Sequence, residues 1–196
     1  MSGSQRTVLI QKGEGIADKI VTGFLCTIPE MKEKLEGGNI MINLGTLKEI
    51  TDLRSIWPHE ALNFTPWVAE NVELLADAVG LDITVDETES SVGNFNVDIY
   101  ASETGTDRKI IIENQLEDTD HDHLGKLITY ASGKDADVVI WVVKHAREEH
   151  KAAVEWLNNH TDDKIGFFLC EIKLFQIGDS DIAPSFTVVE LSLIHI

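Results

Sequence analysis

Acidic and amide side chains stand in and at the end of two apolar stretches in the middle of the chain. Asp98 lies in the first stretch, residues 94–100, and Glu113 and Gln115 end the second, residues 108–115. A carboxylate is rarely left unpaired at the end of a buried strand, because its charge loses its hydration there. A divalent cation, which prefers oxygen ligands, would balance the charge. The residues therefore predict a divalent-cation site.

The two stretches are expected to form the strands of a hairpin, because a short polar turn joins them. Alternate side chains of a strand share a face. In the first strand, Val97 and Ile99 are expected on one face and Asp98 on the other. In the second strand, Glu113 and Gln115 are expected side by side. The hairpin would thus carry all three polar side chains on adjacent strands.

A helix is expected before the hairpin, beginning at Thr65-Pro66. Threonine is a good N-cap and proline is favoured at the first helical position, while Gly80 suits the end. Glu70 borders the apolar stripe of this helix. It belongs either to a solvated acidic face or to the site, and spacing alone does not decide between the two.

The remaining pattern predicts an α/β fold. Helix, three strands, helix, strand, helix and strand follow one another, which indicates a mixed central sheet flanked by helices. The three consecutive strands are expected to be antiparallel, and the crossover parallel. In chain order the later elements are a strand over 81–87, the hairpin, a helix from Asp120 to Gly133, a buried strand over 137–143, a helix over 147–159 and a long strand or strand pair over 165–177.

Composition limits the class of protein. The chain has 196 residues, 43% hydrophobic and 26% charged, as in a globular domain of ordinary size. No apolar run approaches the roughly 20 residues of a membrane span. Cys26 and Cys170 form no disulfide framework, so a cytoplasmic location is expected. The net charge of −18 argues against binding polyanions by bulk electrostatics, so nucleic-acid contact would need a local basic patch, a helix N-terminus or a metal ion.

The segment Asp120-His121-Asp122-His123 has two interpretations. It could bind a transition metal, as in histidine-based hydrolases. Asp120 is also a good N-cap, and acidic residues suit the first turn of a helix. No third histidine or cysteine stands at a typical metal-ligand spacing. Capping and surface roles are therefore favoured over metal binding.

The arrangement of an Asp on one hairpin strand, Glu-x-Gln near the end of the next and then a helix resembles the PD-(D/E)XK superfamily, also called restriction-endonuclease-like. The surrounding residues resemble a prokaryotic branch of it, over about residues 42–190. The matching motifs are Trp57-Pro58-His59-Glu60-Ala61, Phe64-Thr65-Pro66-Trp67, Ser91-Val92-Gly93, Ile112-Glu113-Asn114-Gln115, Asp120-His121-Asp122-His123-Leu124-Gly125 and Ile177-Gly178-Asp179-Ser180. The resemblance implies a restriction-endonuclease-like core of αβββαβ order.

The same resemblance implies metal-dependent hydrolysis of phosphodiester bonds. Asp98 and Glu113 would hold Mg²⁺ or Mn²⁺, and the Asn114 carbonyl would be a third ligand. Glu70 matches the acidic residue that many members carry on the preceding helix, and would complete the shell directly or through water. The ion would polarise the phosphate and lower the pKa of a bound water.

The chain departs from the strongest family pattern at Gln115, which takes the place of a lysine. A lysine can stabilise a charged transition state, whereas a neutral amide can only orient water. Some members carry Gln-hydrophobic-x-x-Tyr on the next helix, and here Lys126 and Tyr130 occupy those positions. Lys126 is proposed to supply the charge that Gln115 cannot. A solvated lysine on an amphipathic helix is the alternative.

The sequence thus predicts a divalent-metal-dependent nuclease domain acting on nucleic acid, with DNA favoured. A catalytically inactive module that binds nucleic acid or protein is the first alternative, and a hydrolase using His121 and His123 is the second. Homodimerisation stays open. Residues 1–41 are expected to be an extension of unknown role, and residues 42–190 the nuclease-like domain.

The last six residues, 191–196, match the translation of a transposon-end sequencing adapter (CTG TCT CTT ATA CAC ATC). The native chain is therefore expected to continue past about Glu190. Members of the branch carry a further C-terminal region, which would contribute to binding.

Overall fold

A computed structural model of the chain describes residues 44–93 and 95–191. The expected extension over 1–41 and residues 192–196 lie outside this described part, as does Asn94. Among the described residues, no helix combines the length and the apolar character needed to cross a bilayer.

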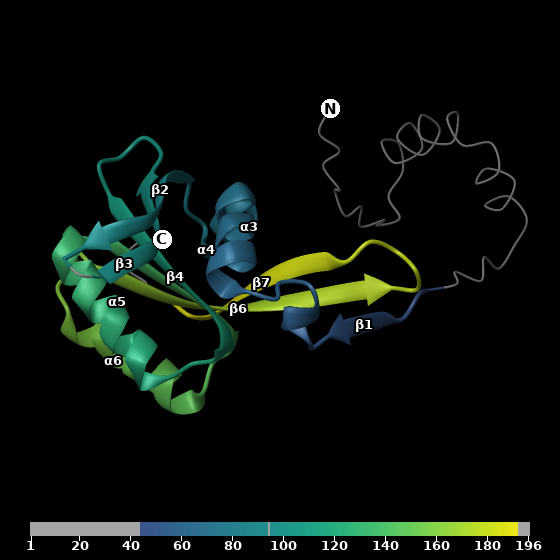
Figure 1. The fold of residues 1–196 in the computed structure, drawn as a ribbon. Coiled ribbons are helices and arrows are strands. Elements are labelled where there is room, and N and C mark those ends of the chain that lie inside the picture. Colours follow the sequence, from purple (N-terminus) through teal and green to yellow (C-terminus); the bar gives the residue numbers. More distant parts are fainter. Residues whose placement is uncertain (1–43, 94, 192–196) are drawn as a thin grey trace, which may run out of the picture. The chain divides into compact units, whose positions relative to one another are not determined.

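A seven-stranded mixed sheet forms the centre of the fold (Figure 1). Six strands follow the order β1-β6-β5-β4-β3-β2, and β7 also pairs with β6. Strands β2, β3 and β4 are antiparallel neighbours, while β4, β5 and β6 are parallel, so the predicted mixed sheet is confirmed. Strands β1 and β7 were not predicted. The strands are β1 Leu47–Ile50, β2 Ile83–Val92, β3 Phe95–Glu103, β4 Lys109–Asp118, β5 Val138–His145, β6 Gly166–Ile177 and β7 Ala183–Glu190.

Helices cover both faces of the sheet (Figure 1). A separate apolar core lies under each helical layer. The first core includes side chains of α3 and α4, and the second includes side chains of α5 and α6. The first six residues of β5 are buried, since this strand has helices on both faces. The helical elements are η1 Leu53–Ser55, η2 Glu60–Phe64, α3 Thr65–Glu70, α4 Val72–Val79, α5 His121–Lys134 and α6 Glu148–His160.

The helix before the sheet meander begins and continues differently from the prediction. The chain enters α3 from a π-helical turn, η2, so Thr65 is not an N-cap. Its buried hydroxyl instead accepts a hydrogen bond from Asn114 Nδ2 at 3.1 Å. The helix is interrupted at Asn71, whose side-chain amide donates to the Trp67 carbonyl at 2.8 Å. It ends at Gly80, as predicted, with the left-handed φ of 75° that glycine tolerates.

The predicted face pattern of β3 is wrong at Asp98. Val97 packs in the core beneath α5 and α6, whereas Ile99 packs in the core beneath α3 and α4. The Asp98 carboxylate accepts the backbone N–H of Asn114 at 2.8 Å. A side chain thus takes the hydrogen bond that a regular ladder would give to backbone, and the alternation of faces breaks at this residue.

Helix α5 also runs further than predicted. It passes through Gly133 to Lys134, and Asp135 ends it in a left-handed conformation, with φ of 53°. A Cβ atom at Gly133 would overlap Val92 Cγ1 on β2. The glycine therefore allows the helix to lie close to the sheet, and does not end it.

Candidate active site

Asp98 and Glu113 face each other across β3 and β4. The paired register of the two strands ends at Ile99 and Ile112. Asp98 lies just beyond this pair, where its carboxylate accepts the Asn114 N–H and its charge acts on Glu113. Asp98 is half-buried and Glu113 is only 3% exposed. The Glu113 Oε2 atom is buried without a hydrogen-bond partner. Two neighbouring carboxylates in such a place need a counter-charge.

The pKa values of both carboxyls reflect this environment. Burial raises the pKa of Asp98 to about 7, and the charges of Glu60 and Glu89 add to the effect. Burial raises the pKa of Glu113 to about 8, and the charge of Asp98 adds to it. The Lys126 charge opposes both shifts. Without a further cation, the pair therefore favours protonated forms near neutral pH.

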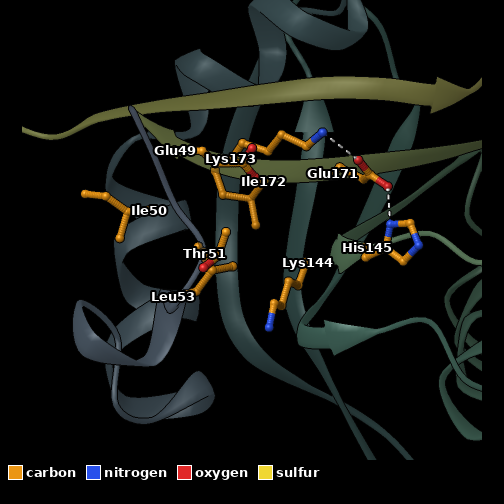
Figure 2. A pocket seen from close by; sticks show the side chains of 9 residues that line it. All are labelled: Glu49, Ile50, Thr51, Leu53, Lys144, His145, Glu171, Ile172 and Lys173. Carbon is orange, nitrogen blue, oxygen red and sulfur yellow. Dashed lines mark hydrogen bonds and ion pairs between the residues drawn. The ribbon is translucent and has the colours of Figure 1, made fainter. Parts of the chain in front are cut away.

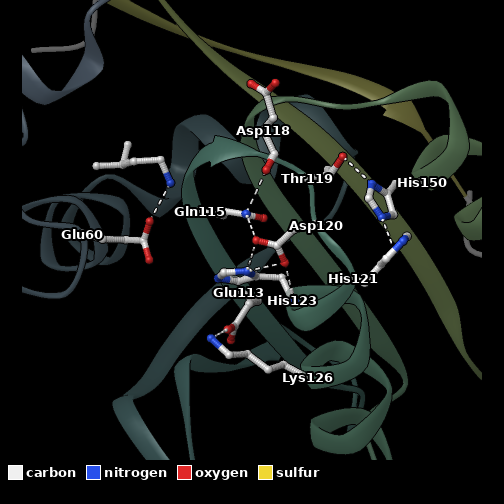
Figure 3. Close-up of polar contacts among 11 residues, drawn as sticks. Glu60, Glu113, Gln115, Asp118, Thr119, Asp120, His121, His123, Lys126 and His150 are labelled. Carbon is white, nitrogen blue, oxygen red and sulfur yellow. Dashed lines mark hydrogen bonds and ion pairs between the residues drawn. The ribbon is translucent and has the colours of Figure 1, made fainter.

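Lys126 and Tyr130 of α5 lie beside Glu113. Lys126 Nζ is 3.5 Å from Glu113 Oε1, and the lysine side chain is 43% exposed (Figure 3). Burial acts to lower the pKa of Lys126, but the charges of Glu113 and other neighbours outweigh it and raise this pKa. Burial and the charge of Glu113 raise the pKa of the buried Tyr130. The structure thus brings both residues to the carboxylate pair.

The Gln115 amide has a fixed orientation. Its Nε2 donates to the Asp118 carbonyl at 2.9 Å and to Asp120 Oδ2 at 2.7 Å (Figure 3). Both partners are acceptors, so they require the nitrogen and fix which way the amide points. Its Oε1 is buried with no partner. Gln115 therefore has an acceptor atom, and no N–H, left for a further contact.

The acidic residue that the structure brings to the site from the preceding helical segment is Glu60. Glu70 is exposed at the end of α3, and no hydrogen bond or ion pair between described residues links it to Asp98 or Glu113. Glu60 Oε2 accepts the Leu116 backbone N–H at 2.6 Å, and its charge raises the pKa of Asp98. Glu60 was not among the residues predicted for the site, although it stands in residues 57–61, a motif that carries the family resemblance.

Buried acceptors without partners gather on β4. Of the four buried and unpartnered side-chain polar atoms in the described part of the chain, three are oxygens of the consecutive residues Glu113, Asn114 and Gln115. The Asn114 side chain lies on the opposite face, against Thr65. The Asn114 N–H points to Asp98. The N–H and C=O groups of one strand residue point to the same neighbouring strand, so the Asn114 carbonyl faces Asp98 as well.

This donor set fits a hard divalent cation. Within residues 44–93 and 95–191, no group of three or more His, Cys, Asp or Glu side chains could hold a metal ion. Mg²⁺ is usually bound by one or two carboxylates and retains several waters. Asp98, Glu113 and the Asn114 carbonyl can supply such an incomplete oxygen shell. The unpartnered Glu113 Oε2 is the observation that favours it.

The histidines of α5 have separate partners. Asp120 caps the helix, as predicted, because its Oδ1 accepts the His123 N–H at 2.8 Å. His121 Nδ1 lies 2.9 Å from His150 Nε2. His150 Nδ1 lies 2.8 Å from the buried Thr119 hydroxyl. Burial and neighbouring positive charge lower the pKa of His150. No sequence signal indicated this partly buried chain of contacts, which joins α5 to α6.

A pocket of about 180 Å³ lies between β1, β5 and β6 and contains a different kind of carboxylate (Figure 2). Glu171 accepts the Ala146 N–H at 2.9 Å, and Lys173 Nζ is 3.2 Å from it. Burial alone would raise the pKa of Glu171, but these contacts and His145 outweigh burial and lower it. Glu171 is thus satisfied by the protein itself, in contrast to Glu113.

Comparisons with known proteins find little sequence similarity. No family model matches the chain, and no curated protein matches it. A repair endonuclease from Pyrococcus abyssi matches 47% of this chain and 41% of its own, with 13% identity and a TM-score of 0.42. EndoMS in a complex with double-stranded DNA matches 61% of this chain and 45% of its own, with 12% identity and a TM-score of 0.41. The chain thus spans less than half the length of either protein, and its similarity to them is distant and structural.

Proposed function

We propose that this chain is a divalent-metal-dependent nuclease domain that hydrolyses phosphodiester bonds in nucleic acid. One observation supports the proposal above the others. Glu113 Oε2 is buried without a partner beside a second carboxylate, Asp98, and both carboxyls have raised pKa values. Mg²⁺ or Mn²⁺ would favour the ionised form of both carboxyls and would be coordinated by Glu113 Oε2.

In this proposal Asp98, Glu113 and the Asn114 carbonyl hold the ion, and Glu60 takes the role that the sequence suggested for Glu70. The bound ion would polarise a phosphate oxygen and lower the pKa of a water. Glu60 already accepts the Leu116 N–H through Oε2. It therefore acts on the ion's shell through its remaining oxygen or through water.

Lys126 and Gln115 together take over the roles of the lysine that the strongest family pattern has at position 115. The Lys126 amine carries the positive charge, and its partial exposure lets it turn from Glu113 to a phosphate oxygen. The free Gln115 Oε1 accepts a hydrogen bond from the attacking water and orients it. Tyr130, one turn after Lys126, positions the substrate.

Nucleic acid is the proposed substrate class, and DNA follows from the family resemblance. The net charge of −18 gives the chain no general attraction for a polyanion. Binding would then depend on the ion and on the few cations near it. Cleavage is accordingly expected to require the metal at the binding step as well as at the chemical step.

A cleavage assay tests the proposal. The wild type is incubated with plasmid DNA, single-stranded and double-stranded oligonucleotides and RNA, with Mg²⁺, Mn²⁺ or EDTA. Metal-dependent cleavage that is lost in the Asp98→Ala, Glu113→Ala double variant supports the proposal. Equal residual cleavage in both proteins would identify a contaminating nuclease and overturn it.

The second candidate is an inactive module with the same fold. The orientation of Gln115 favours it, because both amide hydrogens are committed to Asp118 and Asp120 and none remains for a transition state. Calorimetry on the same samples separates the candidates. Binding of Mn²⁺ and of DNA without cleavage of any substrate would support the binding module.

A further inference from the structure

Glu89 has a strained backbone that its place in the fold does not explain. Only Glu89 and Asp135 are non-glycine residues with positive φ in the described ranges, at 54° and 53°. Asp135 ends α5, where a left-handed residue is usual. Glu89 lies in the middle of β2, where an L-residue in this conformation is costly. Strain of this kind persists where the surrounding structure requires it, which is often a functional site.

Glu89 lies opposite Asp98, one of the two carboxylates of the site. The register pairs Thr88 with Ile99, so the next residue, Glu89, is level with Asp98. Asp98 lies beside Glu113 on the following strand, because its carboxylate accepts the Asn114 N–H and its charge acts on Glu113. The three carboxylate residues therefore lie on the adjacent strands β2, β3 and β4. Adjacent strands are about 4.8 Å apart, so Glu89 is within reach of an ion bound at Asp98.

The electrostatics agree with this geometry. The charge of Glu89 raises the pKa values of both Asp98 and Tyr130, so its carboxylate acts on the same space as the buried pair. An independent observation indicates a ligand there. Glu113 is only 3% exposed, and its buried Oε2 atom has no hydrogen-bond partner.

We propose that Glu89 is a further carboxylate ligand of the divalent cation held by Asp98 and Glu113. This inference rests on the proposed function, because it requires an ion at that pair. Glu89 is exposed on the edge strand β2, so its side chain can turn to the ion without displacing core residues. It would bind only when the ion is present, in keeping with the absence of a pre-assembled three-residue group among the described residues.

Mn²⁺ titration by calorimetry tests the inference on the full chain after removal of metal with EDTA, at one fixed pH. The Glu89→Gln variant is expected to bind Mn²⁺ about tenfold more weakly, or worse, than the wild type. Asp86→Asn is the matched control, because Asp86 is also exposed on β2 and its carboxylate contacts Ser102. It is expected to bind as the wild type does.

A third variant separates a ligand from a structural role. Glu89→Gly removes the carboxylate and also the backbone strain. It is expected to bind Mn²⁺ as weakly as Glu89→Gln, with a Tm no lower than that of the wild type. Loss of affinity that appears only together with a lower Tm would indicate a structural role and overturn the inference.

The remaining outcomes distinguish this inference from the proposed function. If Glu89→Gln binds Mn²⁺ like the wild type while Asp98→Asn does not bind it, the ion site is correct and Glu89 is not a ligand. If the wild type itself binds no Mn²⁺, the proposed function fails, and the inference fails with it.

Discussion

Asp98 Oδ2 accepts the backbone N–H of Asn114 at 2.8 Å, at the point where the regular pairing of β3 and β4 ends. This single hydrogen bond holds one carboxylate beside Glu113 and directs the Asn114 carbonyl to the same side. It also stabilises the ionised form of Asp98, although burial outweighs it and the Asp98 pKa is raised. The site is therefore electrostatically unfavourable in the absence of a cation.

The first prediction concerns stability and pH without metal. Asp98 has a raised pKa in the folded chain, so between about pH 4 and about pH 7 the unfolded state ionises while the folded state keeps its proton. Stability falls with rising pH over this window. Asp98→Asn removes the effect, so its free energy of unfolding should exceed the wild-type value by about 1–3 kcal/mol at about pH 8, and much less at about pH 4.

Urea unfolding in EDTA measures both values, with Asp86→Asn as the control for loss of an exposed carboxylate. An equal difference between Asp98→Asn and the wild type at the two pH values would contradict the prediction.

The second prediction concerns proton release on metal binding. Asp98 and Glu113, with pKa values of about 7 and about 8, are partly protonated at neutral pH and must ionise to bind a cation. Binding of Mn²⁺ near pH 7 is expected to release about one proton per ion, and affinity should rise with pH through this range. Calorimetry in two buffers of different ionisation enthalpy gives the number of protons. A binding enthalpy that is the same in both buffers would rule out the release.

The third prediction compares Glu60 with Glu70, the glutamate that was expected at the site from the sequence. Glu60→Gln keeps an oxygen that can accept the Leu116 N–H but loses the charge near Asp98. It should reduce metal-dependent cleavage about 10–100-fold. Glu70→Gln changes an exposed residue and should leave cleavage within about twofold of the wild type. The reverse pattern of rates would restore Glu70 as the site residue.

The fourth prediction concerns Lys126. Lys126→Gln removes the positive charge 3.5 Å from Glu113 and should lower kcat about 100-fold. The lysine also opposes the raised pKa of Glu113, so the variant should need a higher pH for cleavage. Lys164→Gln, away from the pair, is the matched control. Cleavage by Lys126→Gln with the wild-type rate and pH profile would show that Lys126 is only a surface lysine.

The fifth prediction tests how α5 contacts the sheet. Gly133→Ala would place a methyl group against Val92 Cγ1 and should destabilise the chain by about 1–3 kcal/mol. Gly125→Ala, in the same helix with open space around it, should stabilise by about 0.5–1 kcal/mol. Thermal unfolding of both variants gives the comparison. Stabilisation by both would mean that β2 and α5 are further apart than described.

The sequence by itself determined the elements whose signals are local. Three features follow from the identity of near neighbours in the chain. They are the apolar runs of β4 and β5, the helical spacing of Lys126 and Tyr130, and the helix cap at Asp120. The face shared by Glu113 and Gln115 follows from strand alternation alone. These features are confirmed because strand and helix periodicity depend on short-range geometry.

Only the tertiary structure decided which distant groups meet. Glu60 and Glu70 are ten residues apart in the chain. Glu60 begins the π-helical turn before α3, and there its carboxylate accepts the Leu116 N–H beside the site. The Gln115 orientation depends on Asp120, and the place of Glu89 opposite Asp98 depends on the register of β2 and β3. Such contacts are set by strand register and by the burial of polar groups, which couple residues far apart in the chain and leave no periodic pattern in the sequence.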